Sequence, residues 1–197
     1  MAFDLFQVLL LVIIVGVSAH GTFATSGLAL SSTNLYSAVQ PGGSLYGLQQ
    51  SNPVDTFVAY GEAAGGQGNS PANASTFGTA SDPLVGQRVG GINVFGGGLV
   101  LYRGGVTVGG LGVSGDTSCT DHMVAWRTRN ALKLDHFGAV GSSGSVTGDL
   151  NHPDNIIFDI KPNPNGGTGI SASGFGHPTC LNNPTAGAVS GLPPVTH

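Results

Sequence analysis

Short apolar runs separated by glycines are the most regular pattern in this chain of 197 residues. Three runs, at 92–95, 99–102 and 106–113, are rich in β-branched and large apolar side chains, which is typical of short β-strands. Between the last two runs, the Arg-Gly-Gly segment at 103–105 suits a tight hairpin turn, because glycine tolerates the positive φ angles that such turns require. The pattern therefore predicts neighbouring antiparallel strands.

A short helix is predicted well before these strands. Ser31 or Ser32 is able to act as its N-cap, and Leu35 follows as one of its apolar residues. The Pro-Gly-Gly segment at 41–43 ends the helix, since neither residue type favours its continuation. The sequence at 44–53 adds one further helical turn.

A longer helix is predicted directly after the strands. The Asp-Thr-Ser segment at 116–118 provides three consecutive residues that are able to cap a helix N-terminus, and the helix ends near Leu134. Trp126 flanks the helical face that we expect to pack on the sheet, which consists of Val124, Thr128, Ala131 and Leu132. Beyond this helix, the apolar run at 154–160 predicts a further strand.

The two ends of the chain differ from this central part. Residues 8–17 form an apolar stretch that is too short for the roughly 20 residues of a membrane span, and small residues follow before His20. We therefore expect residues 1–19 to be a signal peptide. Because no Lys or Arg precedes the apolar stretch, a short uncleaved anchor is the alternative, and only then would the chain have a membrane partner.

The remaining chain is predicted to form one domain over residues 20–181, since a chain of this length allows one core. A flexible loop rich in Gly, Ser and Asn is expected at about 61–87. Residues 182–197 are rich in Pro and small residues and lack periodic apolar positions, so they predict a mobile C-terminal tail.

Composition narrows the classes of function. Only 8% of the residues are charged, 34 are Gly, and the formal net charge is -4. A nucleic-acid-binding surface needs clustered Lys and Arg, so we expect no nucleic-acid partner. The Gly-rich segments also do not follow the spacing of phosphate-binding loops between a strand and a helix, which argues against a nucleotide site.

Two cysteines, Cys119 and Cys180, are present, and an even number in an exported chain suggests one disulfide. Such a bridge closes a loop of ~60 residues and is worth about 4 kcal/mol in the chain-entropy model. Two unpaired buried thiols are the alternative. A metal site is less favoured, because no CxxC motif supplies paired ligands.

The start of the longer helix places reactive residue types together. Cys119 lies in the first turn, where backbone N–H groups favour a thiolate, and His122 three residues later is a potential base. A Cys-dependent enzyme is therefore an alternative, although Cys180 is available as a disulfide partner. Asp116 and Asp121 are carboxylates of the kind that serve in acid-base catalysis, but we expect them to cap the N-terminus of the helix.

Histidine is the other residue type with potential ligand chemistry. None of the six histidines forms an HExxH or HxH pair. His177 lies between a glycine and a proline, and a disulfide at Cys180 would bring it close to His122. These two histidines are therefore the candidate cofactor ligands. The alternative is that the segment at 174–180 is a turn, locked against the helix by Phe175.

The run at 96–132 resembles the core signature of the GlcG/HbpS-like haem-binding family, in which a strand of the type GG-(I/L)-P-(I/L), a hairpin, a VGAIGVSG strand and a D-x-x-(I/V)-A helix follow in this order. The corresponding segments here are 97–101, 108–115 and 121–125. The flanking segments resemble a secreted branch of the family. Members of the family usually begin with a long helix and a strand pair, so the resemblance also implies that this chain is N-terminally incomplete.

This resemblance implies an α+β fold, with an antiparallel β-sheet and helices packed on it, that typically assembles into homo-oligomers. It also implies binding of haem or a related tetrapyrrole as cofactor, without catalytic activity, in a secreted, periplasmic or extracellular location. No axial ligand follows from the family, so His122 and His177 rest on the local argument alone. The alternative function is a cofactor-free structural or interaction module that oligomerises through its Gly-rich sheet.

Overall fold

The structure is a computed structural model. The predicted signal peptide at 1–19 and parts of the predicted loop at 61–87 lie outside the part of the chain that it describes. The described residues are 28–60, 62–63, 67–68, 74–76, 79–82, 85–87, 90–138, 144–167, 169–181 and 191–197. None of the helices formed by these residues is long and apolar enough to cross a membrane.

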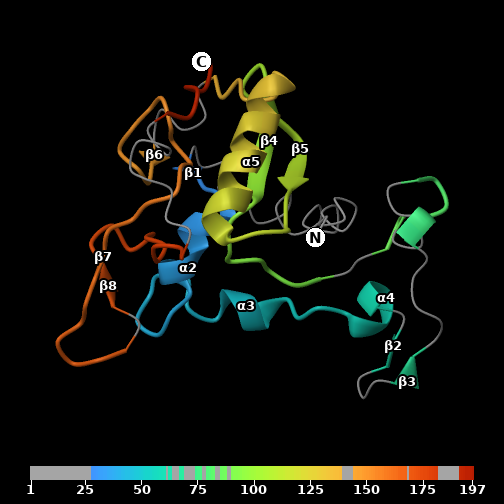
Figure 1. Ribbon diagram of the computed structural model, residues 1–197, viewed down its shortest axis with the longest axis horizontal. Helices are drawn as coiled ribbons and strands as arrows, with labels where there is room; N and C mark the ends of the chain where they lie inside the picture. The colour runs from blue at the N-terminus through green and yellow to red at the C-terminus, as the bar shows by residue number, and fades with distance from the viewer. Residues whose placement is uncertain are drawn as a thin grey trace.

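A β-hairpin with one helix packed on it forms the centre of the fold (Figure 1). Strands β4 (Gly98–Arg103) and β5 (Val106–Gly112) are antiparallel, and helix α5 (Ser118–Ala131) follows them. The two residues between the strands have positive φ angles, 58° at Gly104 and 76° at Gly105. This is the predicted tight turn, and its geometry favours glycine because side chains rarely adopt these angles.

Segments from later in the chain extend this sheet on the side of β4. Tyr102 forms a parallel bridge with Asp135, and His136 forms another with Thr196. The N–H of Tyr102 donates to the carbonyl of Leu134, at 2.8 Å. The C-terminal residues therefore lie beside the chain segment that follows α5.

Shorter elements surround this centre. The 3-10 helix η1 and α2 precede α3 and α4 in the first third, while the small strands pair as β1 with β6, β2 with β3, and β7 with β8. Only the first of these three pairs is parallel. Their bounds are η1 Ser32–Asn34, α2 Leu35–Ala38, α3 Leu48–Ser51, α4 Thr56–Tyr60, η2 Ala74–Thr76, β1 Leu28–Ala29, β2 Glu62–Ala63, β3 Gln67–Gly68, β6 Gly144–Ser145, β7 Ile160–Lys161 and β8 Ile170–Ser171.

The predicted α+β class is confirmed, as are the helix after Ser31 and the extra turn at α3. The strand predicted at 92–95 is wrong: Ile92 and Val94 pack on Leu35 without pairing with a strand. The strand predicted at 154–160 is also wrong for most of its length, since only its last residue enters β7.

Side chains supply part of the backbone hydrogen bonding of this second segment, and the carbonyl of Ile157 accepts from the N–H of His177, at 2.8 Å. The N–H of Ile156 donates to Asn155 Oδ1, at 2.8 Å, and the carbonyl of Asn155 accepts from Asn34 Nδ2, at 3.0 Å. Buried backbone groups need such partners wherever they are found. An apolar run whose backbone bonds to side chains has no need of a neighbouring strand.

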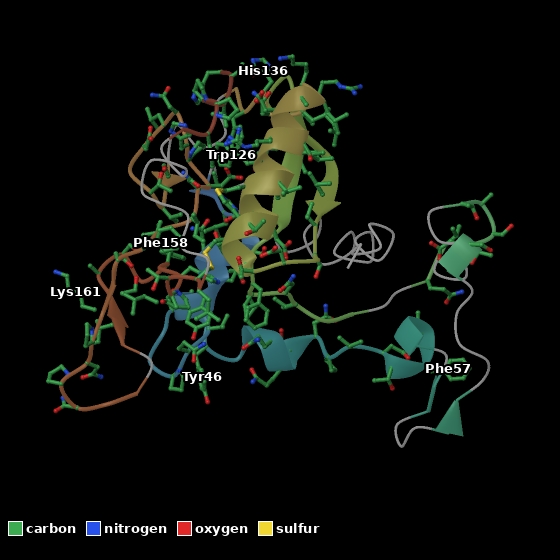
Figure 2. All side chains as sticks on the ribbon, in the orientation of Figure 1. Tyr46, Phe57, Trp126, His136, Phe158 and Lys161 are labelled. Carbon is green, nitrogen blue, oxygen red and sulfur yellow. A yellow bond between two sulfur atoms is a disulfide. The ribbon has the colours of Figure 1, made fainter. Side chains whose placement is uncertain are left out.

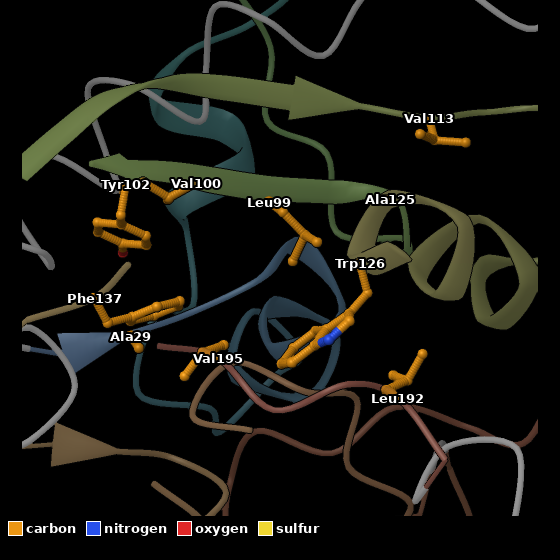
Figure 3. Close-up of a cluster of buried hydrophobic side chains, with 10 residues drawn as sticks. All are labelled: Ala29, Leu99, Val100, Tyr102, Val113, Ala125, Trp126, Phe137, Leu192 and Val195. Carbon is orange, nitrogen blue, oxygen red and sulfur yellow. The ribbon is translucent and has the colours of Figure 1, made fainter. Parts of the chain in front are cut away.

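The main hydrophobic core joins the hairpin, α5 and the C-terminal segment (Figure 3). Leu192 is 3% exposed and Val195 is 6% exposed, and Trp126 Nε1 donates to the carbonyl of Pro193, at 2.8 Å. The prediction of a mobile tail is therefore wrong for residues 191–197, because their two apolar side chains complete the core. Residues 182–190 lie outside the described part of the chain.

The face of α5 that packs on the fold also differs from the predicted one. Val124 and Leu132 are 45% and 57% exposed, and Ala131 is exposed. The buried side chains of the helix are Cys119, Asp121, His122, Ala125, Trp126 and Arg129. Polar or charged side chains make up half of this buried face because each has specific partners, as described in the next subsection.

Replacement of Leu192 tests whether the C-terminal segment belongs to the core. We expect Leu192→Ala to lower the free energy of unfolding by about 2–5 kcal/mol, because it leaves a cavity beside Trp126. Leu181→Ala is the matched control, since Leu181 is 100% exposed, and it should change stability by less than about 0.5 kcal/mol. Urea denaturation followed by tryptophan fluorescence measures both. Equal stability of the two variants would show that residues 191–197 do not pack as described.

Candidate functional site

The N-terminus of α5 is capped as predicted. Thr117 is the N-cap, and its side chain accepts from the N–H of Thr120. Asp121 accepts from the N–H groups of Gly115 and Asp116, at 3.4 and 3.1 Å, and so holds the turn before the helix. Burial raises the pKa of Asp121, and these two hydrogen bonds oppose the rise. The carboxylate therefore has the structural role that the sequence favoured.

Glycines let another segment approach this helix start. A Cβ at Gly96 would collide with the backbone of Ser118, and a Cβ at Gly97 would collide with the carbonyl of Val113. Gly97 also has a φ angle of 101°. The entry to β4 therefore passes directly beside the first turn of α5, which only glycine permits.

The predicted disulfide between Cys119 and Cys180 is confirmed (Figure 2, yellow bond). It joins the first turn of α5 to the segment after β8, across a sequence separation of 61 residues. The N–H of Cys119 donates to Cys180 Sγ, at 3.2 Å. In this state neither sulfur is a thiolate, so Cys119 is not the nucleophile that the alternative enzymatic hypothesis requires.

His177 lies against this disulfide and is only 4% exposed. The two sulfurs and a ring nitrogen of His177 all lie within 4.8 Å of one another. Its Nδ1 is 2.7 Å from the carbonyl of Pro178, which can only accept, so Nδ1 carries the proton. Nε2 is buried and has no hydrogen-bond partner among the described residues. The imidazole therefore presents one buried, unprotonated nitrogen.

His122 lies one turn along α5 from Cys119 and is fully buried. Its Nε2 is 3.0 Å from Asn155 Oδ1, which also accepts from the N–H of Ile156. Nε2 is also 3.2 Å from the backbone N–H of Ile156, which donates to it. The proton therefore lies on Nε2 in the tautomer that donates to Asn155 and on Nδ1 in the tautomer that accepts from Ile156. Nδ1 is buried and has no hydrogen-bond partner in the described part of the chain.

Both imidazoles are held neutral by burial. Burial lowers the pKa of His122 to about 4, and the hydrogen bond with Asn155 opposes this change. Burial also lowers the pKa of His177, against the effect of the Pro178 carbonyl. A charge on His177 would lower the pKa of His122 further, so the two rings are close enough to interact. The two histidines therefore lie near each other, as the sequence predicted for a chain with this disulfide.

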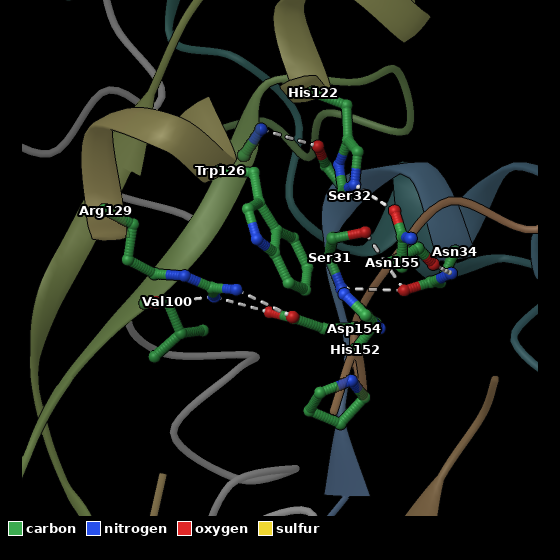
Figure 4. A network of polar contacts seen from close by, with 12 residues as sticks. Ser31, Ser32, Asn34, Val100, His122, Trp126, Arg129, His152, Asp154 and Asn155 are labelled. Atoms are coloured by element: carbon green, nitrogen blue, oxygen red, sulfur yellow. Dashed lines mark hydrogen bonds and ion pairs between the residues drawn. The ribbon is translucent and has the colours of Figure 1, made fainter. Parts of the chain in front are cut away.

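A buried ion pair lies farther along the same face of α5 (Figure 4). Arg129 and Asp154 are both fully buried, and two hydrogen bonds of 2.7 and 2.9 Å join them. Arg129 also donates to the carbonyl of Val100, at 3.2 Å, and its guanidinium lies over the rings of Trp126 and Phe137. This arrangement fixes the segment before Asn155, and therefore the partner of His122.

A groove of about 750 Å³ opens between α2 and β8, and its lining ends at Phe175, so His177 and the two cysteines do not line it. Phe175, Ile170 and Pro41 supply its apolar walls, and the remaining lining residues are Gly, Ser, Asn and Gln. Ser37, which lines the groove, donates from its N–H and its hydroxyl to the carbonyl of Gly176. His177 follows directly, so the disulfide cluster and the groove share one segment of chain.

The sequence therefore identified four of the residues at this junction: His122, His177, Cys119 and Cys180. It missed the ion pair of Arg129 and Asp154. The spacing of His122, Trp126 and Arg129, at i, i+4 and i+7, is the signal that these side chains share one helical face. An arginine on a helix is usually exposed, so this spacing alone does not indicate that Arg129 is buried.

Comparison with known proteins finds no family model, no curated protein and no solved structure that matches this chain. The resemblance to the GlcG/HbpS-like family therefore rests on the sequence segments described above. The chemistry of the site has to be argued from its own residues.

The buried histidines predict that the protein loses stability in weak acid. The unfolded chain takes up a proton at His122 below the ordinary pKa of 6.5, whereas the folded chain does so only near 4. The unfolded state then binds more protons, so stability falls as the pH falls from 6.5 to 4, by about 3 kcal/mol from this residue. His177 contributes in the same direction.

Urea denaturation between pH 7 and pH 4 checks this prediction. We expect His122→Gln to flatten the pH dependence, because the variant has no imidazole to protonate. His136→Gln is the control, since the side chain of His136 is only partly buried. The expectation is contradicted if both variants lose stability with the same slope as the parent chain.

Proposed function

We propose that this chain is a non-catalytic, haem- or tetrapyrrole-binding protein, and that the macrocycle lies in the groove between α2 and β8. The groove is the observation that carries the proposal. Its volume of about 750 Å³ falls in the range of ~300–1,000 Å³ that is usual for small-molecule and cofactor sites. A bound haem would supply an iron atom and a large flat apolar surface.

The residues of the groove suit such a ligand. Phe175, Ile170 and Pro41 offer apolar contact for a flat ring. Glycine N–H groups and serine hydroxyls around them offer hydrogen bonds for carboxylate substituents. Ser37 holds Gly176 in place, so the wall that carries Phe175 is anchored to α2.

His177 is the residue that we propose as the axial ligand. It follows Phe175 by two residues, and the hydrogen bond from its Nδ1 to Pro178 leaves Nε2 unprotonated. A neutral imidazole with one free nitrogen is the form that binds haem iron. His122 has a different role in this proposal, because its ring lies on α5 and holds Asn155. We therefore assign His122 to the stability of the interior.

Export to an oxidising compartment is part of the proposal. The disulfide between Cys119 and Cys180 supports it, because such bridges persist in secreted and periplasmic proteins and are rare where thiols are kept reduced. The apolar stretch at 8–17 and the small residues after it support a signal peptide.

A haem titration of the purified, oxidised chain, followed by the Soret absorbance, tests this function. We expect a saturable, red-shifted Soret band, and a loss of affinity of at least about tenfold in His177→Ala, because an iron–nitrogen bond is removed. His136→Ala is the matched control and should bind as the parent chain does. The fluorescence of Trp126 shows whether each variant is folded. A folded chain without a saturable band, or equal binding by both variants, would overturn the proposal.

The second candidate is a cofactor-free interaction module that forms homo-oligomers through β5. Of the described residues, only those of β4 pair with β5, so its other edge has unpaired backbone groups. Val106 and Val108 on this strand are 63% and 51% exposed. Unpaired strand edges with apolar side chains favour the addition of another strand, and the glycines of β5 permit its close approach.

Sedimentation velocity over a range of concentrations tests this second candidate. We expect association of the parent chain, and its loss in Val108→Lys, because a charge on an edge strand opposes pairing with a second copy. Val124→Lys is the control, since Val124 is equally exposed but lies on α5. A parent chain that remains monomeric at every concentration, or equal effects of the two variants, would exclude the β5 interface.

A further inference from the structure

The disulfide cluster contains the donor atoms of a metal site. Cys119 Sγ, Cys180 Sγ and a ring nitrogen of His177 lie within 4.8 Å of one another. Cys119 and His177 are buried, and Cys180 is partly buried. Thiolate and imidazole together are the ligands that Zn²⁺ prefers in proteins. In the oxidised state the sulfurs bind each other, so these donors become available only on reduction.

The unpartnered nitrogens of the two histidines are an independent observation. Buried polar atoms nearly always have a hydrogen-bond partner, so each exception calls for an explanation. The three buried side-chain atoms without a partner among the described residues include His177 Nε2 and His122 Nδ1. In His177 the other nitrogen carries the proton, because its partner, the Pro178 carbonyl, can only accept. Nε2 of His177 therefore has the lone pair that a metal requires, and Nδ1 of His122 has it in the tautomer whose proton is on Nε2.

The sequence places the four residues in two matching pairs. Cys119 and His122 are three residues apart in α5, so they share one face of the helix. His177 and Cys180 are also three residues apart, in the reverse order. The pattern is thus Cys-x-x-His followed by His-x-x-Cys. Neither half contains a CxxC motif, so the pattern does not have the paired cysteines by which zinc sites are usually identified in a sequence.

We propose that, when the disulfide is reduced, Cys119, Cys180 and His177 bind one Zn²⁺ ion, and that His122, whose ring nitrogens lie outside the group of donor atoms within 4.8 Å of one another, approaches as the fourth ligand. Two sulfur and two nitrogen ligands give the tetrahedral coordination of structural zinc sites. Nδ1 of His177 is hydrogen-bonded to the Pro178 carbonyl, and Nε2 of His122 is hydrogen-bonded to Asn155. In zinc sites, such a hydrogen bond to the second ring nitrogen orients a histidine ligand. The site is closed, so its role is structural.

The proposal includes one redox step and one binding step. A dithiol reductant gives two electrons and two protons to the Cys119–Cys180 bond, which becomes two thiols, while the dithiol becomes a disulfide. Binding of Zn²⁺ to the two thiols then releases two protons. The position of Cys119 in the first turn of α5 favours its thiolate. The same residues thus hold the chain together by a covalent bond when oxidised and by a metal when reduced.

This inference does not depend on the proposed function, because it concerns the reduced chain without haem. The proposed haem site and the proposed zinc site both use His177, so the metal-binding experiment is done without haem. Failure to bind haem and failure to bind metal are then separate results.

Co²⁺ titration of the full chain tests the metal site, because Co²⁺ takes the place of Zn²⁺ and its bonds to thiolates absorb light. The chain is reduced with a phosphine, which takes up one oxygen atom from water as the disulfide becomes two thiols. We expect one Co²⁺ per reduced chain, cobalt–thiolate absorption, and displacement by one Zn²⁺. We expect no such absorption from the oxidised chain. The Cys119→Ser/Cys180→Ser double variant is the matched control, since it lacks the bridge and the thiolates together.

Histidine variants distinguish a built site from adventitious binding by two thiols. In His177→Ala and in His122→Ala the affinity for Co²⁺ should fall more than about 100-fold. The loss of a group that only hydrogen-bonds to a metal ligand already lowers metal affinity about 10–100-fold. His136→Ala should bind as the parent chain does. Tryptophan fluorescence reports folding. A reduced chain that unfolds without metal and refolds with one equivalent of Zn²⁺ also supports the site.

Three results would overturn the proposal. The first is a reduced chain, folded or unfolded, that gives no cobalt–thiolate absorption. The second is an affinity that His136→Ala lowers as much as His177→Ala does, which would indicate non-specific binding. The third is an unchanged cobalt spectrum in His122→Ala, which would remove the fourth ligand.

Discussion

The ion pair between Arg129 and Asp154 is the interaction on which the interior of this protein depends. Both side chains are fully buried, and taking each charge out of water costs several kcal/mol. The two hydrogen bonds between them, a third to Val100 and the rings of Trp126 and Phe137 around the guanidinium offset this cost. Removal of one partner would leave the other charge buried without a counter-ion.

Several contacts follow from the position of this pair. The pair ties α5 and β4 to Asp154, and the next residue, Asn155, is thereby placed to meet His122 and Asn34. At the start of the same helix, the disulfide ties Cys119 to the segment that carries His177. One face of α5 thus carries a covalent bond, a hydrogen-bonded imidazole and an ion pair in succession. With a core of few apolar residues, specific polar partners replace part of the usual hydrophobic packing.

Local features of the fold could be predicted from the sequence because neighbouring residues determine them. The turn at Gly104 and the cap at Thr117 depend on residue type and short spacing. The pairing of Cys119 with Cys180, 61 residues apart, could be predicted because the chain has two cysteines. The buried face of α5 could not be predicted in this way. Arg129 is buried only because Asp154 lies opposite, and that partner is 25 residues away in the chain. The packing of Leu192 likewise depends on a cavity formed by distant segments, which its own Pro-rich surroundings do not indicate.

In the candidate site too, residue types could be predicted from the sequence, whereas contacts between distant segments could not. The disulfide and the two histidines were predicted from residue type, and the structure places them together. The roles of the two rings could not be predicted, since these depend on which nitrogen is bonded by Pro178 or Asn155. The groove is formed by α2 and β8, which are far apart in the sequence. Such a surface exists only once the chain has folded.

A double-mutant cycle on the ion pair tests the central claim of this account most directly. The free energies of unfolding of Arg129→Met, Asp154→Leu and the double variant are compared with that of the parent chain in urea. Each single variant should lose about 3–5 kcal/mol, and the double variant should lose far less than the sum, because no unpaired charge remains. Additive losses would contradict the account, since they would show that the two side chains do not depend on each other.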